Sequence, residues 1–352
     1  MASTAVVNNQ PNVQAPQMEP FQLLMQFSSG YMVSAALYVV AKLSIAESLA
    51  DGPKPISALA SGTGMKEDPL YRIMRALASV GMFAEPQPRT FALTPVSDLL
   101  RADAPGSLRN MVLWMTNKLH FDVWGEMLHS VKTGQPAIEH VHQKPCFEVF
   151  APELEHTVEF NNAMTNISQM TIPAVLGSYD FSGINTLVDV GGGHGYLLCE
   201  IVKKHPGLKG VVFDMEQVLD GTRKRIGENR LSGRVSCCAG NFFEDVPADG
   251  DAYIMQHIIH DWADDQALTI LKNVHRSLAG KKNGKLLILD SVIKDNSVGD
   301  FNTWKDLEML LMPGGRERTE AEFRELLGKA GFKVTRVIPT PAMVAVIEAV
   351  PV

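Results

Sequence analysis

Short apolar runs alternate with amphipathic segments through the second half of the chain. The apolar runs are bounded by turn residues, as buried strands are, and lie at 187–190, 210–214, 234–238, 251–255 and 285–290. Between them apolar positions recur at helical spacing, for example over 196–204 and 266–278. This alternation predicts a parallel sheet covered by helices on both faces. A helix at 320–331 and closing strands at 334–338 and 342–347 are predicted to complete it.

The first hundred residues have a different pattern. Apolar residues with few charges recur at helical spacing over 20–49, which predicts a helix that needs a partner to cover it. A helix at 56–62, a second helix at 68–80 capped by Asp68, and an extended pair ending at 91–95 follow. Helix, turn, helix and ribbon together predict a winged helix.

Aromatic and methionine residues recur at helical spacing between these two regions. Most of them are expected to be core residues, and a few are expected to line a pocket. The first 17 residues show no apolar period, which is typical of a disordered segment. The predicted divisions are a lead-in at 1–17, a winged-helix domain at 18–107, linking helices at 108–176 and an α/β domain at 177–352.

A glycine-rich turn directly follows the first predicted strand of the sheet. Gly191, Gly193 and Gly195 do not fit the first, third and sixth positions of a dinucleotide fingerprint. With Asp189 before them, they resemble the first motif of S-adenosylmethionine (SAM) methyltransferases. Asp214 ends the next apolar run, where a carboxylate can accept both hydroxyls of a ribose. The alternative is a tight turn in an ordinary α/β domain.

Composition limits the function further. A chain of 352 residues suits two domains, and a formal net charge of −7 argues against general binding to nucleic acid or anionic membranes. The four cysteines show no framework spacing, so reduced thiols and no disulfides are expected. The longest apolar run, 31–41, is too short to span a bilayer. We therefore expect a soluble cytoplasmic protein with a small-molecule partner and no membrane contact.

Winged helices commonly bind DNA, but the charges of this segment argue against that function. Residues 51–103 carry as many acidic as basic side chains, which leaves no basic face for phosphates. The second helix presents Leu70, Met74 and Leu77 at core spacing rather than polar groups for base edges. An interaction or dimerisation role is favoured, and a ligand-sensing regulator remains the alternative from another class.

The candidate chemistry follows the strand at 251–255. His260 lies just beyond its carboxyl end, beside the predicted cofactor crevice. Methyl transfer from a sulfonium is an in-line displacement, and an acceptor hydroxyl must lose its proton. A histidine, with a pKa of about 6.5, suits that task. Either Asp290 or Glu317 is expected to orient the imidazole.

Two other interpretations of His260 remain open. His257, His260 and Asp261 have the spacing of half a zinc or iron site, which His140 and His142 would complete. The cysteines offer no ligand pattern, and nothing in the sequence brings the two histidine pairs together, so we expect no metal. A purely structural, hydrogen-bonded His260 is the second alternative.

The order of motifs makes the resemblance specific. Asp189 to Gly195, Phe213-Asp214, the segment 240–243, His260 to Trp262 and the segment 313–319 occur in the order seen in small-molecule O-methyltransferases. From about Pro20 the chain is similar to the plant caffeic-acid-type and the bacterial acetylserotonin- and hydroxyneurosporene-type enzymes. The resemblance implies a Rossmann-like SAM methyltransferase sheet and an N-terminal winged helix that forms a homodimer and helps close the partner's pocket.

The resemblance also implies roles for individual residues. The expected catalytic residues are His260 as base, with Asp290 and Glu317 beside it. The cofactor-binding positions are Asp189, Gly191, Gly193, Asp214, Met215, Asn241, Phe242, Gln256 and Trp262, of which Phe242 and Trp262 flank the adenine. The substrate pocket is lined by Phe160, Met164, Ile167, Met309 and Met312.

Four positions depart from the plant enzymes. Asn241 replaces an Asp, and Gln256 replaces a Lys, both on the cofactor side. Asp290 is one methylene shorter than the usual Glu, so Glu317 takes a larger part in orienting His260. Ile167 replaces a polar residue and makes the pocket more apolar.

The sequence thus predicts a homodimeric SAM-dependent O-methyltransferase of secondary metabolism. It would act on a hydroxyl, most simply a phenol, of a small aromatic metabolite and release S-adenosylhomocysteine. A C- or N-methyltransferase on the same scaffold is the alternative among enzymes.

Overall fold

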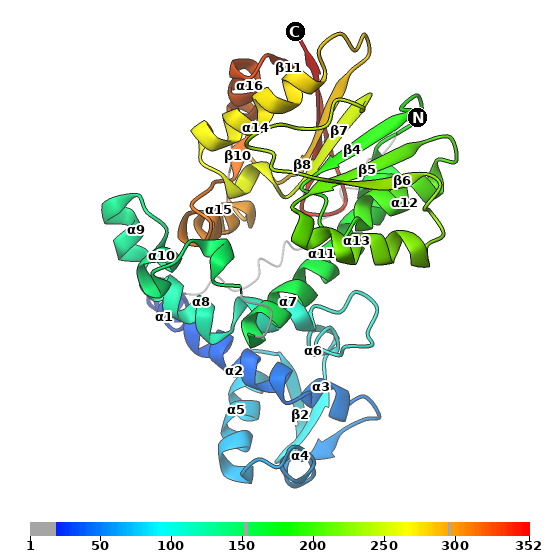
Figure 1. Ribbon diagram of the computed structural model, residues 1–352. Helices are drawn as coiled ribbons and strands as arrows, with labels where there is room; N and C mark the ends of the chain where they lie inside the picture. The colour runs from blue at the N-terminus through cyan, green and yellow to red at the C-terminus, as the bar shows by residue number, and fades with distance from the viewer. Residues whose placement is uncertain (1–18, 151–153, 295, 297) are drawn as a thin grey trace, which may run out of the picture. The chain divides into compact units, whose positions relative to one another are not determined.

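The computed structural model describes residues 19–150, 154–294, 296 and 298–352 (Figure 1). The predicted lead-in at 1–17 lies outside the described residues. The chain forms two compact units, 1–104 and 105–352. The helices from 109 to 178 belong to the second unit, together with the large sheet.

The first unit is mainly helical, with a small sheet. Its helices are α1 (Pro20–Ser28), α2 (Gly30–Lys42), α3 (Ile45–Ser48), α4 (Ile56–Thr63), α5 (Glu67–Ser79) and α6 (Pro95–Asp98). Strands β1 (Lys54–Pro55), β2 (Phe83–Gln87) and β3 (Thr90–Leu93) pair antiparallel in the order β1-β3-β2. Helix α5 buries Leu70, Met74 and Leu77, so its apolar face belongs to the core. The helix pair and ribbon match the predicted winged helix.

Two local predictions in this unit are wrong. The single helix over 20–49 breaks at Ser29 and again at Leu43 and Ser44. The Ser29 hydroxyl donates to the carbonyl of Met25 ahead of a poor helix former, Gly30, and Ser44 adopts a left-handed φ of 52°. Asp68 does not cap α5. It lies in the first turn beside Glu67, where the helix dipole favours acids.

The second unit begins with a group of helices. These are α7 (Arg109–Met115), α8 (Lys118–Gly125), α9 (Met127–Thr133), α10 (Ala137–His142), the short 3₁₀ helix η1 (Cys146–Glu148) and α11 (Glu155–Ser178). Helix α11 packs along α7, and α10 packs against α8 and α9.

The large sheet contains the five strands predicted as parallel and both closing strands. They are β4 (Thr186–Val190), β5 (Lys209–Asp214), β6 (Val235–Ala239), β7 (Ala252–Gln256), β8 (Lys285–Asp290), β11 (Phe332–Pro339) and β12 (Ala345–Pro351). The order is β11-β12-β8-β7-β4-β5-β6. Strands β4 to β8 are parallel, and β12 is antiparallel to both neighbours. The predicted α/β architecture, a parallel sheet with closing strands at one edge, is confirmed.

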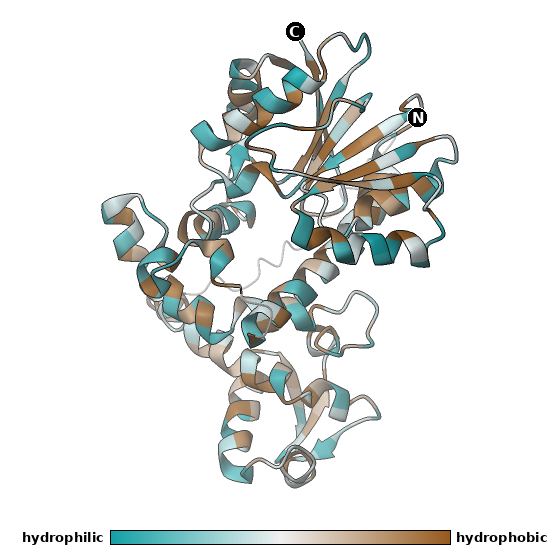
Figure 2. Ribbon diagram, viewed as in Figure 1, coloured by the Kyte–Doolittle hydropathy of each residue, from teal (hydrophilic) through white to brown (hydrophobic). Residues whose placement is uncertain are grey.

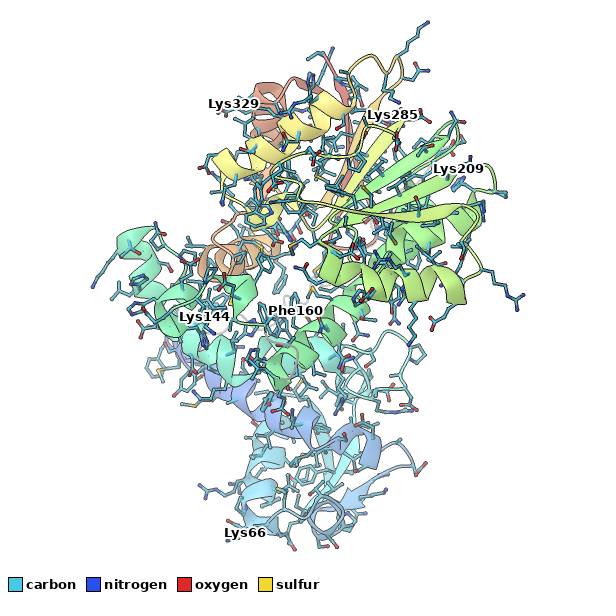
Figure 3. All side chains as sticks on the ribbon, viewed as in Figure 1. Lys66, Lys144, Phe160, Lys209, Lys285 and Lys329 are labelled. Carbon is cyan, nitrogen blue, oxygen red and sulfur yellow. The ribbon has the colours of Figure 1, made fainter. Side chains whose placement is uncertain are left out.

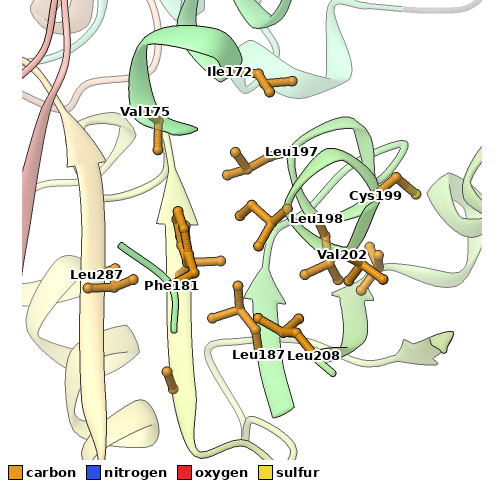
Figure 4. Packing of buried hydrophobic residues seen from close by; sticks show 14 of the residues in the cluster. Ile172, Val175, Phe181, Leu187, Leu197, Leu198, Cys199, Val202, Leu208 and Leu287 are labelled. Carbon is orange, nitrogen blue, oxygen red and sulfur yellow. The ribbon is translucent and has the colours of Figure 1, made fainter. Parts of the chain in front are cut away.

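Helices cover both faces of this sheet. One face packs against α12 (Tyr196–Lys204), α13 (Glu216–Glu228) and the end of α11, where Ile172 and Val175 join Leu198 and Leu287 in one cluster (Figure 4). The other face packs against α14 (Asp264–Ser277) and α16 (Glu320–Lys329). Apolar residues run along the strands between these layers (Figure 2). Nearly continuous apolar strands are what burial on both faces requires.

Three elements that the sequence pattern did not indicate lie near the strand ends. Strands β9 (Val292–Ile293) and β10 (Arg318–Thr319) form a short parallel pair, and α15 (Asn302–Leu311) lies between them in the chain. Among the described residues no single helix is both long and apolar enough to cross a membrane, and only the bent pair α1 and α2 meets that requirement jointly.

Candidate active site

The carboxyl ends of the parallel strands form the candidate site. Lys209 and Lys285 mark the opposite, amino ends of β5 and β8 (Figure 3). At the carboxyl end of β4, Gly191 adopts a φ of +69° and donates its N–H to the carbonyl of Phe213 at 2.8 Å. A Cβ on Gly191 would lie 2.5 Å from Ile258 Cδ1. Only glycine fits this turn without strain.

The turn holds the Asp214 carboxylate in place. Asp214 Oδ2 accepts the N–H of Gly193 at 2.8 Å, and Oδ1 accepts the N–H of Met215 at 2.7 Å. Burial raises the pKa of Asp214 above its usual range, although these two hydrogen bonds oppose the rise. Each oxygen keeps a free lone pair, so the fixed carboxylate can accept two further donors.

The Asp189 side chain packs against the buried side of the glycine turn. It is buried at the end of β4, and a Cβ on Gly192 would lie 2.8 Å from its carboxyl carbon. Burial and the nearby Asp214 raise the pKa of Asp189 to about 7. Asp189 is therefore packed under the turn rather than exposed at the crevice.

The other predicted cofactor residues follow β5, β6 and β7. Phe242 and Trp262 meet edge to face with ring centroids 6.0 Å apart. Asn241 uses its side-chain oxygen to accept the N–H of Phe243, so it caps its own turn. Met215 is about half exposed after β5, and Gln256 ends β7. All nine predicted positions thus lie at the same edge of the sheet.

His260 is buried in the short helix η2 (Ile259–Asp261) after β7. Its Nδ1 is 2.8 Å from Glu317 Oε1 and 3.8 Å from Asp290 Oδ1, and its Nε2 is 3.4 Å from Asp261 Oδ1. The structure therefore brings together all three residues predicted to be catalytic. Asp290 ends β8, and Glu317 precedes β10.

A cation that the sequence analysis missed lies in this cluster. Lys305 Nζ on α15 is 2.9 Å from Glu317 Oε1 and 3.3 Å from His260 Nδ1, and it donates to Ser291 Oγ at 2.9 Å. A signal for it exists in the sequence, because Lys305 lies four residues before Met309, a predicted pocket residue, and shares its helix face.

The surrounding charges oppose one another at His260. Burial and the charge of Lys305 lower the pKa of His260. The carboxylates of Asp290, Asp261 and Glu317 raise it, and the net pKa of His260 lies above the usual value. Burial also raises the pKa of Asp261 to about 6 and raises the pKa of Asp290. For Glu317, the hydrogen bond from His260 and the charge of Lys305 outweigh burial and lower the pKa.

The segment 314–318 fixes the backbone around His260. A Cβ on Gly315 would overlap the carbonyl oxygen of His260, and the Arg316 N–H donates to that oxygen at 2.8 Å. Buried Arg318 donates to the carbonyls of Ile259 and Trp262, each at 3.0 Å. Arg318 has a structural role that its motif alone did not reveal.

Three of the predicted pocket residues share one apolar cluster. Phe160 on α11, labelled in Figure 3, packs with Met164 and Met312 in a cluster that includes Trp114. The rings of Phe160 and Phe150 stack with their centroids 4.9 Å apart, and the Trp114 ring centroid lies 5.1 Å from that of Phe160. Ile167 and Met309 are half-buried on α11 and α15 and are not members of this cluster in the described chain.

A buried polar network beside this cluster was not predicted. Glu308 on α15 accepts the Trp124 N–H at 2.7 Å and lies 2.8 Å from His120 Nε2. Asn117 contacts His120 at 3.1 Å and donates to Glu159 at 2.9 Å. The network ties α8 to α11 and α15, which carry the predicted pocket residues.

The structure brings together a different group of metal donors from the one that the sequence spacing suggests. Among the described residues, the His, Cys, Asp and Glu side chains that gather closely enough to hold an ion are His257, His260 and Asp290. His140 does not join them and stacks instead on His129, with ring centroids 4.1 Å apart.

Comparison with known proteins defines the class. Residues 124–333 match the O-methyltransferase domain, and residues 25–103 match the O-methyltransferase dimerisation domain. The chain belongs to the O-methyltransferase family and is a SAM-dependent O-methyltransferase, as the motifs predict. The dimerisation domain covers the winged helix, which favours the enzyme over a DNA-binding regulator.

Several relatives match almost the whole chain. Phenazine O-methyltransferase PhzM of Lysobacter antibioticus is 38% identical over 94% of this chain and 96% of its own. The 8-amino-8-demethylriboflavin N,N-dimethyltransferase of Streptomyces davaonensis is 33% identical over 95% of this chain and 96% of its own. The structure of CalO1, a methyltransferase in calicheamicin biosynthesis with S-adenosylhomocysteine bound, has a TM-score of 0.83 at 29% identity and covers 96% of this chain and all of its own.

Proposed function

We propose that this enzyme methylates a hydroxyl group on a planar, largely apolar aromatic molecule, with His260 as general base. The observation that carries the proposal is the buried pair of His260 Nδ1 and Glu317 Oε1 at 2.8 Å, positioned at the strand ends beside the glycine turn. The family supports methyl transfer, and the acceptor class rests on the aromatic cluster around Phe160.

The glycine turn and Asp214 fit SAM. The fixed Asp214 carboxylate has lone pairs for two ribose hydroxyls, and the glycine-rich turn leaves its main chain open to a ligand. Gly191, Gly193 and Gln256 would contact the methionine side, and Met215, Asn241, Phe242 and Trp262 the adenosine side. When bound, SAM supplies a methyl group activated by its sulfonium charge.

His260 removes the proton of the acceptor. Its Nδ1–H donates to Glu317, which fixes the tautomer and leaves the Nε2 lone pair to accept the hydroxyl proton. Two carboxylates stabilise the imidazolium that forms. Asp290 Oδ1 lies 3.8 Å from Nδ1, and Asp261 Oδ1 lies 3.4 Å from Nε2. Phe160, Met164, Ile167, Met309 and Met312 hold the acceptor ring. This methyl transfer uses no metal, so EDTA is not expected to lower the rate.

The first test is calorimetric binding of SAM and S-adenosylhomocysteine. Asp214→Asn keeps the shape of the side chain but removes its charge and one acceptor. It is expected to weaken the binding of both ligands at least tenfold. Asp220→Asn on the exposed face of α13 is the matched control and should bind like the wild type. Equal binding by Asp214→Asn and the wild type would remove Asp214 from the cofactor site.

N-methylation is the second candidate, because one relative at 33% identity is named as an N,N-dimethyltransferase. Loss of a general base costs about 10²- to 10⁴-fold in rate for a phenol that must be deprotonated. An amine is already nucleophilic and loses little. His260→Ala assayed with matched phenol and aniline acceptors therefore separates the two functions.

A further inference from the structure

Among the described residues, five of the buried side-chain polar atoms that lack a hydrogen-bond partner lie near His260. They are both ring nitrogens of His257, both carboxylate oxygens of Asp290 and Glu317 Oε2. More than nine in ten buried polar groups in folded proteins are hydrogen-bonded, so a cluster of five such atoms calls for a bound ion or water that contacts them.

The three donor side chains are close together. Asp290 Oδ1 is 3.8 Å from His257 Nδ1 and 3.8 Å from His260 Nδ1. The two imidazoles lie nearly parallel, with centroids 5.2 Å apart and planes 24° apart. His257 has a left-handed φ of 56° directly after β7, a conformation that a β-carbon disfavours and that the surrounding structure must hold in place.

We propose that His257, His260 and Asp290 bind a divalent transition-metal ion such as Zn²⁺. Two imidazoles and a carboxylate suit Zn²⁺, Co²⁺, Ni²⁺ or Cu²⁺ rather than Mg²⁺ or Ca²⁺, which prefer oxygen. With metal–ligand bonds of about 2.1 Å, a tetrahedral site needs donors roughly 3.4 Å apart. Each measured separation needs to shorten by about 0.4 Å.

The consequence for catalysis rests on the proposed role of His260. A metal bound through the Nδ1 lone pair requires the imidazole proton on Nε2, and no proton is gained or lost in that tautomeric shift. The bond to Glu317 is broken, and Nε2, now protonated, cannot accept the proton of an acceptor hydroxyl. Metal binding therefore switches the base off.

Lys305 limits the strength of this site. Its ammonium group is 3.3 Å from His260 Nδ1 and 2.9 Å from Glu317, where it repels a dication and neutralises one carboxylate. The site is therefore weaker than a structural zinc site, and removal of the Lys305 charge is expected to strengthen it.

The test titrates Co²⁺ and Zn²⁺ into the full chain without SAM. We expect one equivalent of Co²⁺ per chain with visible absorption of a low-symmetry site, and displacement by Zn²⁺. His257→Asn and Asp290→Asn should each weaken binding at least about tenfold. Lys305→Met should tighten it, a gain that misfolding cannot imitate. His140→Asn, in the half-exposed pair with His129, is the matched control and should bind like the wild type.

Three results would overturn the proposal: no Co²⁺ spectrum in the wild type, unchanged binding in His257→Asn, or a loss confined to His140→Asn. Stoichiometric binding without inhibition of methyl transfer would overturn the switch. The Co²⁺ spectrum needs neither SAM nor acceptor, so a failure of the proposed methyl transfer leaves the metal site decided independently.

Discussion

Lys305 is the residue whose charge most directly sets the state of His260. Asp261, Asp290 and Glu317 surround the imidazole with acid groups, the second imidazole of His257 stacks on it, and Lys305 supplies the nearby cation. Without that cation, the carboxylates would hold the imidazole protonated over a wider pH range. A general base has to be neutral to act, so Lys305 keeps His260 usable.

Lys305→Met is expected to move the acidic limb of the kcat/KM profile to higher pH. The substitution removes a charge that lowers the pKa of His260, so the pKa rises and the neutral imidazole forms at higher pH. The profile is measured with a phenolic acceptor in EDTA, which excludes metal effects. Lys305→Arg keeps the charge and should retain the wild-type limb. An unshifted limb in Lys305→Met would show that Lys305 does not tune the base.

The residue-level prediction from sequence depended on strand ends. His260, Asp290 and the glycine turn each follow a predicted strand, and parallel strands bring their carboxyl ends to one edge, so their proximity could be inferred. Lys305 and His257 could not be placed in the same way. Lys305 lies on a helix whose position depends on tertiary packing. The orientation of the His257 side chain depends on the left-handed backbone conformation of His257 itself.

At the level of elements, the contact between the Gly314-Gly315 turn and η2 positions His260. Gly315 has no room for a side chain, because its α-carbon faces the backbone of His260 and Asp261. The loop after β7 is therefore held by a turn more than fifty residues later in the chain. The sequence motif contains both glycines, but the pattern did not show which element they contact.

Gly315→Ala is expected to lower the free energy of unfolding by about 1–3 kcal/mol, the usual cost of an overpacked site. It should also lower kcat at least tenfold, because η2 carries His260. The control, Gly328→Ala on α16, adds its methyl group to open space and should change the unfolding free energy by less than about 1 kcal/mol. Urea denaturation and steady-state rates measure both. Similar effects in the two variants would contradict the proposed contact.

Glu348 on β12 is a second element-level anchor. It accepts hydrogen bonds from Tyr179 and Thr335 at 2.6 Å and 2.7 Å and from Arg336 at 2.6 Å, and so ties the end of α11 to β11. Burial raises the pKa of Glu348, but Arg336, Tyr179, Thr335 and Lys285 lower it to about 2.

Glu348→Gln is expected to cost about 2 kcal/mol of unfolding free energy near neutral pH. The folded-state pKa is depressed, so the charged carboxylate contributes its full stability above pH 4.5, and that contribution is lost as pH falls toward 2. The difference between wild type and variant should therefore shrink across this window in denaturation experiments. A difference that stays constant from pH 6 to pH 2 would show that the charge is not the stabilising feature.

At the level of the whole molecule, the first unit exposes a large apolar surface on α1 and α2. Its exposed side chains are Phe21, Leu24, Met25, Phe27, Tyr31 and Met32. Such a surface on one protomer is typical of an interface. Residues 25–42 of this segment lie within the match to the dimerisation domain, and residues 20–24 directly precede it. The sequence pattern already indicated an uncovered helix, although not its division into separate helices.

The double variant Leu24→Asp and Met32→Asp is expected to convert the homodimer into monomers, because two charges would be buried without partners. Light scattering after size exclusion measures the mass. The control, Met65→Asp, places the same charge on an exposed apolar side chain between α4 and α5 and should remain dimeric. Dimers in the double variant would locate the interface elsewhere.

The position of β12 has a consequence for how the protein is made. β12 follows the other six strands in the chain, yet it is an interior strand between β8 and β11. Until it emerges from the ribosome, β8 presents a bare edge with the apolar run Leu286 to Leu289, the kind of edge that recruits other chains. The α/β unit therefore completes its folding only after β12 has been translated. Chaperone supply and translation rate during that interval, rather than final stability, are expected to govern the yield of native enzyme.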